Sequence, residues 1–304
     1  TFANEPAARA AGISADDLRG KTMASIMGPV KGGFYGKINE AILDSFAHSD
    51  DTEAERQSHV HTFGEDDELE VFKTDHIPLR GDRDYPPGVL MVMDDITEYT
   101  MERRKSDMMM RQLINALIGV VERRDPNTTH QSAHISEVAC AIAREMEVSD
   151  DEVKTVDIAG SLINLGRVFI PNDVLAKSGP LSAAEQALFD NCYKDSVELL
   201  TDVEFQGPVV ETISQTGEFW DGSGPQGLKE DEILHPARIL AVAAAFIALV
   251  NPRSSETPVS FDVAVSQLML QNGSRFDRKP VSALINYLDN RGGAEKWADF
   301  GKTS

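Results

Sequence analysis

Histidine is scarce in the C-terminal part of the chain, and this scarcity limits the metal chemistry available there. The chain has 7 histidines, and those beyond residue 100 are His130, His134 and His235. A two-metal hydrolytic site needs several imidazoles and carboxylates that converge on the cations. Because the spacing of these histidines does not supply such a set, the sequence predicts no metal cofactor in this part of the chain.

Two residues of the same region remain alternatives as metal ligands. His134 lies one helical turn after Gln131. If the helix were shifted by about one turn, His134 would take the place of Gln131 and could ligate a metal there. The apolar spacing of Ile135 and Val138 favours the unshifted helix, in which Gln131 and not His134 occupies that position. Cys192 has the chemistry to bind zinc, but the sequence offers it no cluster of partner ligands. We therefore expect a buried apolar side chain at Cys192.

Two basic residues are candidates for phosphate binding. Lys177 and Arg238 each have the charge to contact a phosphate group. The chain also has 50 acidic residues, so each of the two could instead form an ion pair with a carboxylate. The sequence leaves both alternatives open.

Charge and hydropathy disfavour two classes of partner. The formal net charge is −21, whereas a protein that binds nucleic acid or an anionic membrane surface presents a basic face. The longest apolar run, Ile239–Val250, is shorter than the roughly 20 residues of a membrane span. The two cysteines, Cys140 and Cys192, form no CxxC motif. We expect no nucleic-acid or membrane partner and a reducing, cytoplasmic location.

Hydrophobic patterns divide the chain into three parts. Residues 1–95 mix short helices with two predicted strands, Leu69–Leu79 and Gly88–Met93. A connecting helix follows over residues 96–124, and residues 125–304 are predicted to be all-helical. The connecting helix carries an apolar stripe with helical spacing, formed by Met110, Leu113, Leu117 and Val121. This stripe predicts either packing on its own domain or a parallel helix pair in a homodimer, and we favour the homodimer.

The first part resembles a PAS sensor domain. The residues that carry the resemblance are Phe2–Ala8, Gly12–Gly20 and the Asp94–Thr97 motif, which commonly ends a PAS core and opens a signalling helix. The resemblance implies an α+β fold with an antiparallel sheet, whose first strand we expect upstream of Thr1. The ligand of such a domain is not identified by the sequence. Haem ligation is an alternative, through His59, His61 and His76.

The last part resembles the HD-GYP family, which hydrolyses cyclic di-GMP with a two- or three-metal centre. The matching blocks follow one another in the family's order: Asp125–Thr128, Ser161–Pro171, Val174–Leu181, Trp220–Gly224 and Ala237–Ala243. The resemblance implies an all-α HD-type domain joined to the PAS-like part, and so a multidomain chain.

The resemblance also implies that the family's metal-binding and catalytic positions are replaced. The residues at those positions are Gln131, Ile163, Asn164, Arg167, Cys192, Thr216, Gly217 and Ala244. Ile163 and Ala244 cannot ligate a metal, and Asn164 bridges two cations poorly. Without a cation, no bound water is acidified to hydroxide at neutral pH.

These departures lead to a functional expectation with two alternatives. The expected function is a non-catalytic signalling protein, in which PAS input passes through a dimeric helix to a metal-free HD domain that binds a protein partner. The first alternative is a receptor for cyclic di-GMP or a related nucleotide. The second alternative is a residual metal-dependent cyclic di-GMP phosphodiesterase.

Overall fold

The fold was analysed in a computed structural model. It describes residues 8, 12, 14, 16–18, 20–47, 56–65, 68–81, 86–124, 130–177, 179–252 and 257–300. Of the sequence motifs, Asp125–Thr128 and most of Phe2–Ala8 lie outside the described residues. The chain divides into two compact units, Thr1–Met108 and Met109–Ser304.

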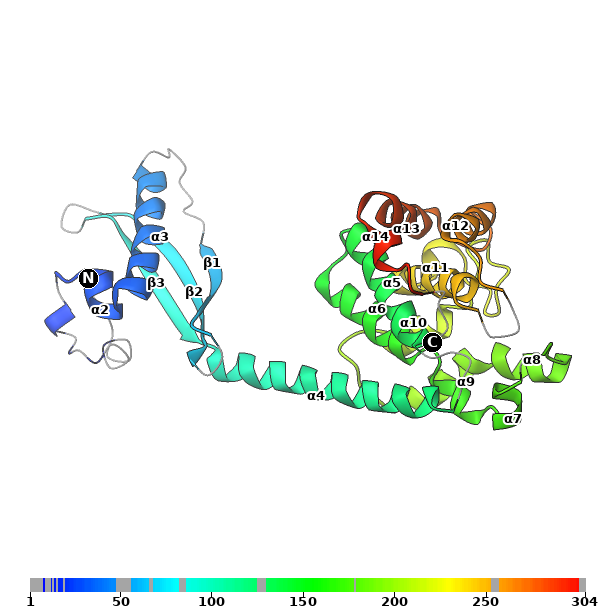
Figure 1. The fold of residues 1–304 in the computed structure, drawn as a ribbon. Coiled ribbons are helices and arrows are strands. Elements are labelled where there is room, and N and C mark those ends of the chain that lie inside the picture. The colour runs from blue at the N-terminus through cyan, green and yellow to red at the C-terminus, as the bar shows by residue number, and fades with distance from the viewer. Residues whose placement is uncertain are drawn as a thin grey trace. The chain divides into compact units, whose positions relative to one another are not determined.

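The N-terminal unit is a helix packed on a small antiparallel sheet (Figure 1). Its helices are η1 (Asp16–Leu18), α2 (Met23–Met27) and α3 (Pro29–Ala47), and its strands are β1 (Gln57–Phe63), β2 (Glu70–Leu79) and β3 (Gly88–Asp95). The strand order is β1-β2-β3. The two predicted strands pair with each other as β2 and β3, with His76 opposite Met91. The sequence analysis did not predict β1, which pairs with the other edge of β2.

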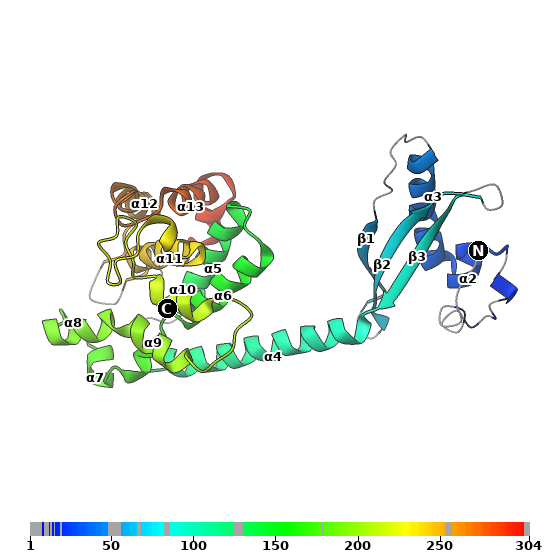
Figure 2. The same cartoon turned by 180° about the vertical axis from the view of Figure 1, so that it is seen from behind.

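Alternation along β1 places its aromatic side chains on the face covered by α3. His61 and Phe63 contact the rings of Phe34 and Tyr35, which come from α3. Tyr35 is fully buried. Figures 1 and 2 show α3 lying along the sheet in both views. The core of this unit is therefore rich in aromatic and imidazole rings.

Helix α4 (Thr97–Glu122) follows β3 after a single residue. The Thr97 backbone N–H donates to Asp95 (3.0 Å), and the Thr97 hydroxyl oxygen accepts a hydrogen bond from the Val71 N–H (2.8 Å). These bonds fix the start of the helix against β2. In its second half, Ile114 and Val121 are buried, whereas Leu113 is 57% and Leu117 48% exposed. The predicted apolar stripe is thus divided between an inward and an outward face.

The C-terminal unit is all-helical (Figures 1 and 2). Its elements are α5 (Gln131–Glu145), α6 (Asp150–Leu162), η3 (Leu165–Phe169), α7 (Asn172–Leu175), α8 (Ala183–Asp190), α9 (Cys192–Leu200), α10 (Val209–Gln215), η4 (Glu230–Glu232), α11 (His235–Val250), α12 (Phe261–Leu270), α13 (Arg278–Asn290) and α14 (Gly293–Lys296). Helix α11 packs against α5, α6, α10, α12 and α13, so it forms the centre of the core.

Helix caps explain several of these boundaries. Ser182 and Glu185 form a reciprocal capping box at the start of α8. At the start of α6, Ser149 accepts a hydrogen bond from the Glu152 N–H. Glu152 does not complete a capping box here as Glu185 does in α8, because its carboxylate contacts Nδ1 of His235 at 2.5 Å. That contact joins α6 to the first turn of α11.

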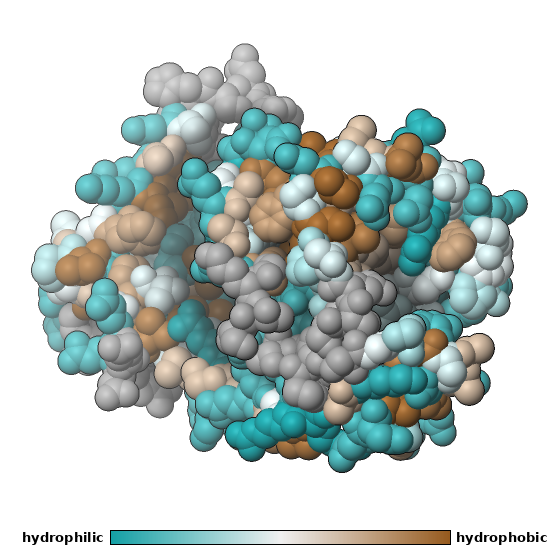
Figure 3. Space-filling model, turned by 45° about the vertical axis from the view of Figure 1, so that its right-hand side comes forward, coloured by the Kyte–Doolittle hydropathy of each residue, from teal (hydrophilic) through white to brown (hydrophobic). Residues whose placement is uncertain are grey.

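The surface mixes apolar and polar side chains. Figure 3 shows brown apolar groups scattered among teal polar ones on the face in view. Across residues 8–300, as far as the structure describes them, no helix is both long and apolar enough to cross a bilayer.

Candidate functional site

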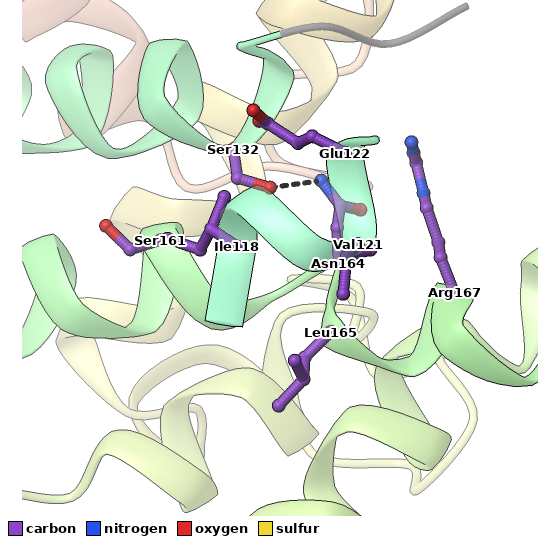
Figure 4. A pocket seen from close by; sticks show the side chains of 8 residues that line it. All are labelled: Ile118, Val121, Glu122, Ser132, Ser161, Asn164, Leu165 and Arg167. Carbon is purple, nitrogen blue, oxygen red and sulfur yellow. Dashed lines mark hydrogen bonds between the residues drawn. The ribbon is translucent and has the colours of Figure 1, made fainter. Parts of the chain in front are cut away.

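A small pocket of the C-terminal unit lies between the end of α4, the start of α5 and the turn into η3. Its lining residues are Ile118, Val121, Glu122, Ser132, Ser161, Asn164, Leu165 and Arg167 (Figure 4). The cavity volume is about 10 Å³, which is room for roughly one water molecule. Of the predicted positions, Asn164 and Arg167 line the pocket. Gln131 lies next to it, because its side chain accepts a hydrogen bond from Arg167.

Hydrogen bonds join the polar side chains of this pocket. Asn164 donates to the Ser132 hydroxyl oxygen (3.2 Å), and both side chains are buried. Arg167 donates through Nη2 to Oε1 of Gln131 (2.7 Å). Amides and a guanidinium therefore occupy three of the positions that the resemblance assigns to the family's metal-binding and catalytic residues. A guanidinium beside amide donors is suited to recognising a phosphate group.

Glu122 is the acidic side chain of the pocket. Its Oε1 is buried and has no hydrogen-bond partner among the described residues. Burial raises the pKa of the Glu122 carboxyl, although a hydrogen bond from the His130 backbone N–H and the charges of His130 and Arg167 act in the opposite direction. The sequence analysis did not select Glu122. The signal that could have found it is its position, two residues before the end of the predicted helix and three residues before Asp125.

Two other predicted positions, Ile163 and Cys192, belong to the packing of the unit. Ile163 is fully buried in the main hydrophobic cluster. Cys192 is 3% exposed, and burial raises the pKa of its thiol. Ser196 supports this region, because its hydroxyl donates to the Ile163 carbonyl and accepts from the Gly166 N–H, both at 2.8 Å. These contacts hold η3 against α9.

Of the remaining predicted positions, Thr216 and Gly217 follow α10 directly, and Ala244 lies in α11. The Thr216 hydroxyl donates to the Thr212 carbonyl of its own helix (2.7 Å), and Ala244 is buried in α11. Next to Gly217, the buried Glu218 carboxylate accepts the backbone N–H groups of Gln226 (2.8 Å) and Leu228 (3.2 Å). Glu218 therefore fixes the loop that resembles the family's GYP segment.

Both phosphate candidates form ion pairs. Lys177 lies 2.7 Å from Glu185, and this pairing lowers the pKa of the Glu185 carboxyl to about 2. Arg238 contacts Asp277 at 3.0 Å and Asp231 at 3.1 Å. The sequence left phosphate binding and ion pairing open for these two residues, and the structure shows an ion pair at each.

Arg238 is also held by an aromatic ring. Its guanidinium lies 5.4 Å from the centroid of the Trp220 ring, a cation–π distance. Its side chain is 12% exposed. A phosphate group would have to displace the carboxylates before it could contact Arg238.

His134 does not point toward the pocket. Its ring stacks on Phe300 with centroids 4.0 Å apart, and burial lowers its pKa. Among the residues that the structure describes, no group of three or more His, Cys, Asp and Glu side chains could hold a metal ion. The described side chains therefore do not fit the metal centre that the resemblance implies, and no reaction step is assigned to a metal.

The chain matches the model of the HD domain over residues 115–279. It belongs to the HD domain family. The match extends from the second half of α4 to the start of α13, so the end of α4 and the pocket beside it lie within the family's domain.

Three curated relatives show what the chain is similar to. The chain is 32% identical to the cyclic di-GMP phosphodiesterase response regulator RpfG of Xanthomonas campestris over 58% of this chain and 47% of the relative. It is 32% identical to the 3'3'-cGAMP-specific phosphodiesterase 2 of Vibrio cholerae over 59% of this chain and 35% of the relative. It is 28% identical to a probable cyclic di-GMP phosphodiesterase of Vibrio cholerae over 75% of this chain and 58% of the relative. The chain thus spans less than two thirds of the length of each of these relatives.

These relatives correct two expectations drawn from the sequence. The expectation of a non-catalytic regulator is wrong, because the matched relatives are named as phosphodiesterases. The expectation of an HD domain without a metal cofactor is wrong with it, because the family that the chain resembles is metal-dependent, although the described side chains alone do not form such a centre. The replaced positions alone pointed away from hydrolysis, whereas the similarity of the whole domain to proteins named as phosphodiesterases favours it.

Proposed function

We propose that the C-terminal unit is a phosphodiesterase that acts on a cyclic dinucleotide. The observation that carries this proposal is the 32% identity to a cyclic di-GMP phosphodiesterase over 178 residues. Identity of the same level to a 3'3'-cGAMP-specific enzyme supports the wider class of 3',5'-linked cyclic dinucleotides as substrate.

The pocket at the end of α4 supplies this chain's own contribution to the proposed reaction. Arg167 carries a charge that can pair with a phosphodiester oxygen, and Asn164 and Ser161 add neutral polar groups beside it. Because the cavity holds roughly one water molecule, the dinucleotide would lie across its mouth with one phosphate facing Arg167. Holding the phosphate in a fixed orientation toward water lowers the entropic part of the barrier.

A hydrolysis assay tests the proposal. The full chain is incubated with cyclic di-GMP and separately with 3'3'-cGAMP, after addition of Mn²⁺ or Fe²⁺ and in parallel with a chelator. Linear dinucleotide or mononucleotide products, separated by chromatography, are the expected result. Arg167→Gln should lower kcat/KM by about tenfold to a hundredfold, since a charged hydrogen bond contributes about 1.5–3 kcal/mol. Absence of product from both substrates under every metal condition contradicts the proposal.

We propose further that residues 1–95 form a PAS-like sensor domain, residues 96–124 a signalling helix and residues 125–304 the HD-GYP-like domain. The packing of α3 on an antiparallel sheet and the Asp94–Thr97 motif support the sensor assignment. The proposed reducing, cytoplasmic location rests instead on the two cysteines, Cys140 and Cys192, which form no CxxC motif. Binding of a cyclic dinucleotide by the purified chain at neutral pH would be consistent with this arrangement.

A homodimer through α4 belongs to the same proposal. Leu113 and Leu117 face outward from the unit that buries Val121, so they are available to a second copy. Met110 is only partly buried and packs on the core. Leu113→Glu and Leu117→Glu together should give a monomer in light scattering, whereas Leu270→Glu, at an exposed leucine of α12, should leave the mass unchanged. An unchanged mass of the α4 variant contradicts the dimer.

A further inference from the structure

The end of α4 is fastened to the segment that leads from η3 into α7. Arg124 lies two residues after α4, in the turn that follows the helix, and its backbone N–H donates to the Val121 carbonyl at 3.0 Å. Its side chain contacts residues 168–172, which run from the end of η3 to the first residue of α7. The guanidinium therefore joins two stretches of chain that lie 44 to 48 residues apart in the sequence.

The Arg124 guanidinium donates hydrogen bonds to oxygens of three residues in this segment. Nε and Nη2 both donate to Oδ1 of Asn172, at 3.1 and 2.8 Å. Nη2 also donates to the Ile170 carbonyl at 3.3 Å, and Nη1 donates to the Val168 carbonyl. Because the donors lie in one rigid plane, the acceptors must keep fixed relative positions for all these bonds to form. A lysine ammonium does not reproduce this pattern.

Other contacts hold the same segment to the helical unit. The Ile170 side chain is 1% exposed and packs in a small apolar cluster with side chains of α7. Just before this segment, the Gly166 N–H donates to the Ser196 hydroxyl of α9 at 2.8 Å. Arg124 adds to these contacts a direct connection to the end of α4.

The segment bound by Arg124 begins directly after Arg167. Arg167 and Asn164 line the pocket together with residues from the last turn of α4. The Arg167 N–H donates to the Asn164 carbonyl (3.1 Å), and the Ile170 N–H donates to the Arg167 carbonyl (3.0 Å). A displacement of residues 168–172 relative to α4 would therefore move Arg167 in a pocket of only about 10 Å³.

We propose that Arg124 is a positioning residue, which holds residues 168–172 against the end of α4 and so fixes where the Arg167 guanidinium meets a phosphate group of the ligand. This inference rests on the proposed function for the identity of that ligand and for the role of Arg167. The connection between α4 and η3 does not rest on it, because hydrogen bonds within the chain form that connection. Movement of α4 would carry Arg124 with it and shift Arg167.

A comparison of kinetic constants tests the effect on the pocket. Hydrolysis of cyclic di-GMP by the full chain is measured for the wild type, Arg124→Lys, Arg167→Gln and the double variant. Arg124→Lys should lower kcat/KM by about tenfold to a hundredfold, because a misplacement of about 1 Å can cost that much. Part of this loss should be a higher KM, whereas a smaller folded fraction would lower kcat alone. The double variant should stay within about twofold of Arg167→Gln, because both changes remove the same contact.

Arg111 provides the matched control on α4. Its Nη2 lies 3.0 Å from Asp157 of α6, and this carboxylate also accepts a hydrogen bond from the Ser136 hydroxyl at 2.7 Å. Arg111→Lys therefore alters another arginine that fastens α4, but leaves the connection to η3 intact. It should keep kcat/KM within about twofold of the wild type, because an exposed ion pair contributes little. Equal losses in the two lysine variants would overturn the proposal, since any fastening of α4 would then serve.

Hydrogen exchange measures the hold on η3 without a ligand. In Arg124→Lys, peptides that cover residues 165–172 should exchange about tenfold faster, the effect of losing a hydrogen bond to a charged group. Peptides of α11 should keep their protection. Asn172→Ala removes one acceptor and leaves the arginine in place, so it should give a smaller increase, and it replaces Arg124→Lys if that variant does not fold. Unchanged exchange of residues 165–172 overturns the proposal.

The outcomes distinguish this inference from the function on which it rests. Wild-type kinetics in Arg124→Lys, or losses that add to those of Arg167→Gln, overturn the positioning role while the phosphodiesterase assignment survives. A wild type that neither binds nor hydrolyses cyclic di-GMP or 3'3'-cGAMP overturns the proposed function and, with it, the phosphate contact of Arg167. Faster exchange in the Arg124 variant would then still support the hold on η3.

Discussion

In the C-terminal unit, buried hydroxyl groups donate to helix carbonyls, whereas in the N-terminal unit the buried polar groups centre on ionisable rings. The hydroxyls of Thr212 and Thr216 bond back to their own helix. In the N-terminal unit, His76 is fully buried between Asn39 (2.7 Å) and Thr74 (3.1 Å). Buried hydroxyls that are fully bonded are insensitive to pH, while buried imidazoles are not.

Two of the unsatisfied polar atoms of the N-terminal unit belong to its buried rings. Nε2 of His61 and the hydroxyl of Tyr35 are both buried without a partner among the described residues, and their rings lie 5.6 Å apart. The helical unit has a large continuous apolar cluster around α11. The comparison teaches that one unit depends on apolar packing and the other on the protonation state of a few rings. Four predictions test this difference.

The largest expected effect is a cavity in the core of the helical unit. Phe246 of α11 is fully buried, with its ring near Phe261 (5.4 Å) and Trp297 (6.2 Å). Phe246→Ala should lower the free energy of unfolding by about 3–5 kcal/mol, the usual cost of such a truncation. Both tryptophans, Trp220 and Trp297, lie in this unit, so their fluorescence in urea reports its unfolding.

The control for this prediction is the same substitution at the surface. Phe169 is 58% exposed, and Phe169→Ala should change the free energy by no more than about 0.5–1 kcal/mol. Equal losses in the two variants would show that apolar burial does not determine the stability of the helical unit.

The second effect comes from a buried carboxylate of the helical unit. Glu218→Ala removes a carboxylate that accepts two loop N–H groups. The expected loss is about 2–3 kcal/mol, because hydrogen bonds to a charged group are strong and their donors are left unpaired. The loop over residues 219–229 should also become a site of proteolysis. Glu211→Ala is the exposed control, and a Glu218 variant as stable and as resistant as this control would contradict the assigned role.

Much of the fold, but less of the site, could be predicted from the sequence. Periodicity located β2, β3 and α4 to within two residues at each end, because their apolar patterns are regular. Strand β1 was missed because His59 and His61 occupy inward positions that a pattern of apolar residues does not identify. The burial of Glu122 depends on α5 and η3 packing around it, which no local pattern encodes. The ion pairs of Lys177 and Arg238 likewise depend on partners 8 and 39 residues away.

Acidification should affect the N-terminal unit before the helical core. Burial lowers the pKa of His61 and His76, and the charge of His59 lowers both further, while Asp75 opposes this at His76. The unfolded chain therefore binds more protons as the pH falls through about 6.5. The stabilisation of the N-terminal unit by the neutral imidazoles of His61 and His76 is fully present above that pH and is lost as the pH falls below it.

Hydrogen exchange provides the measurement for this pH dependence. Between pH 7.5 and 5.5, after correction for intrinsic exchange, protection of β2 should fall while protection of α11 is retained. His61→Gln should reduce the loss in β2. Parallel loss of protection in both elements would show that acid acts on the whole chain, and the contrast between the two units would then be wrong.

The smallest predicted effect on stability has the opposite sign, because this substitution should not destabilise the N-terminal unit. Tyr35 is fully buried with an unpartnered hydroxyl, and burial raises its pKa to about 12. Tyr35→Phe removes an unsatisfied polar group, so it should leave the protection of β2 unchanged or raise it by up to about 1 kcal/mol. Tyr287→Phe is the matched control in the helical unit, where Glu137 and, to a smaller extent, Tyr287 raise the pKa of the Lys296 ammonium; loss of the Tyr287 hydroxyl should cost about 0.5–1 kcal/mol. A loss of stability in Tyr35→Phe as large as in this control would mean that the Tyr35 hydroxyl has a partner, such as an ordered water, and that this ring does not distinguish the N-terminal unit from the helical one.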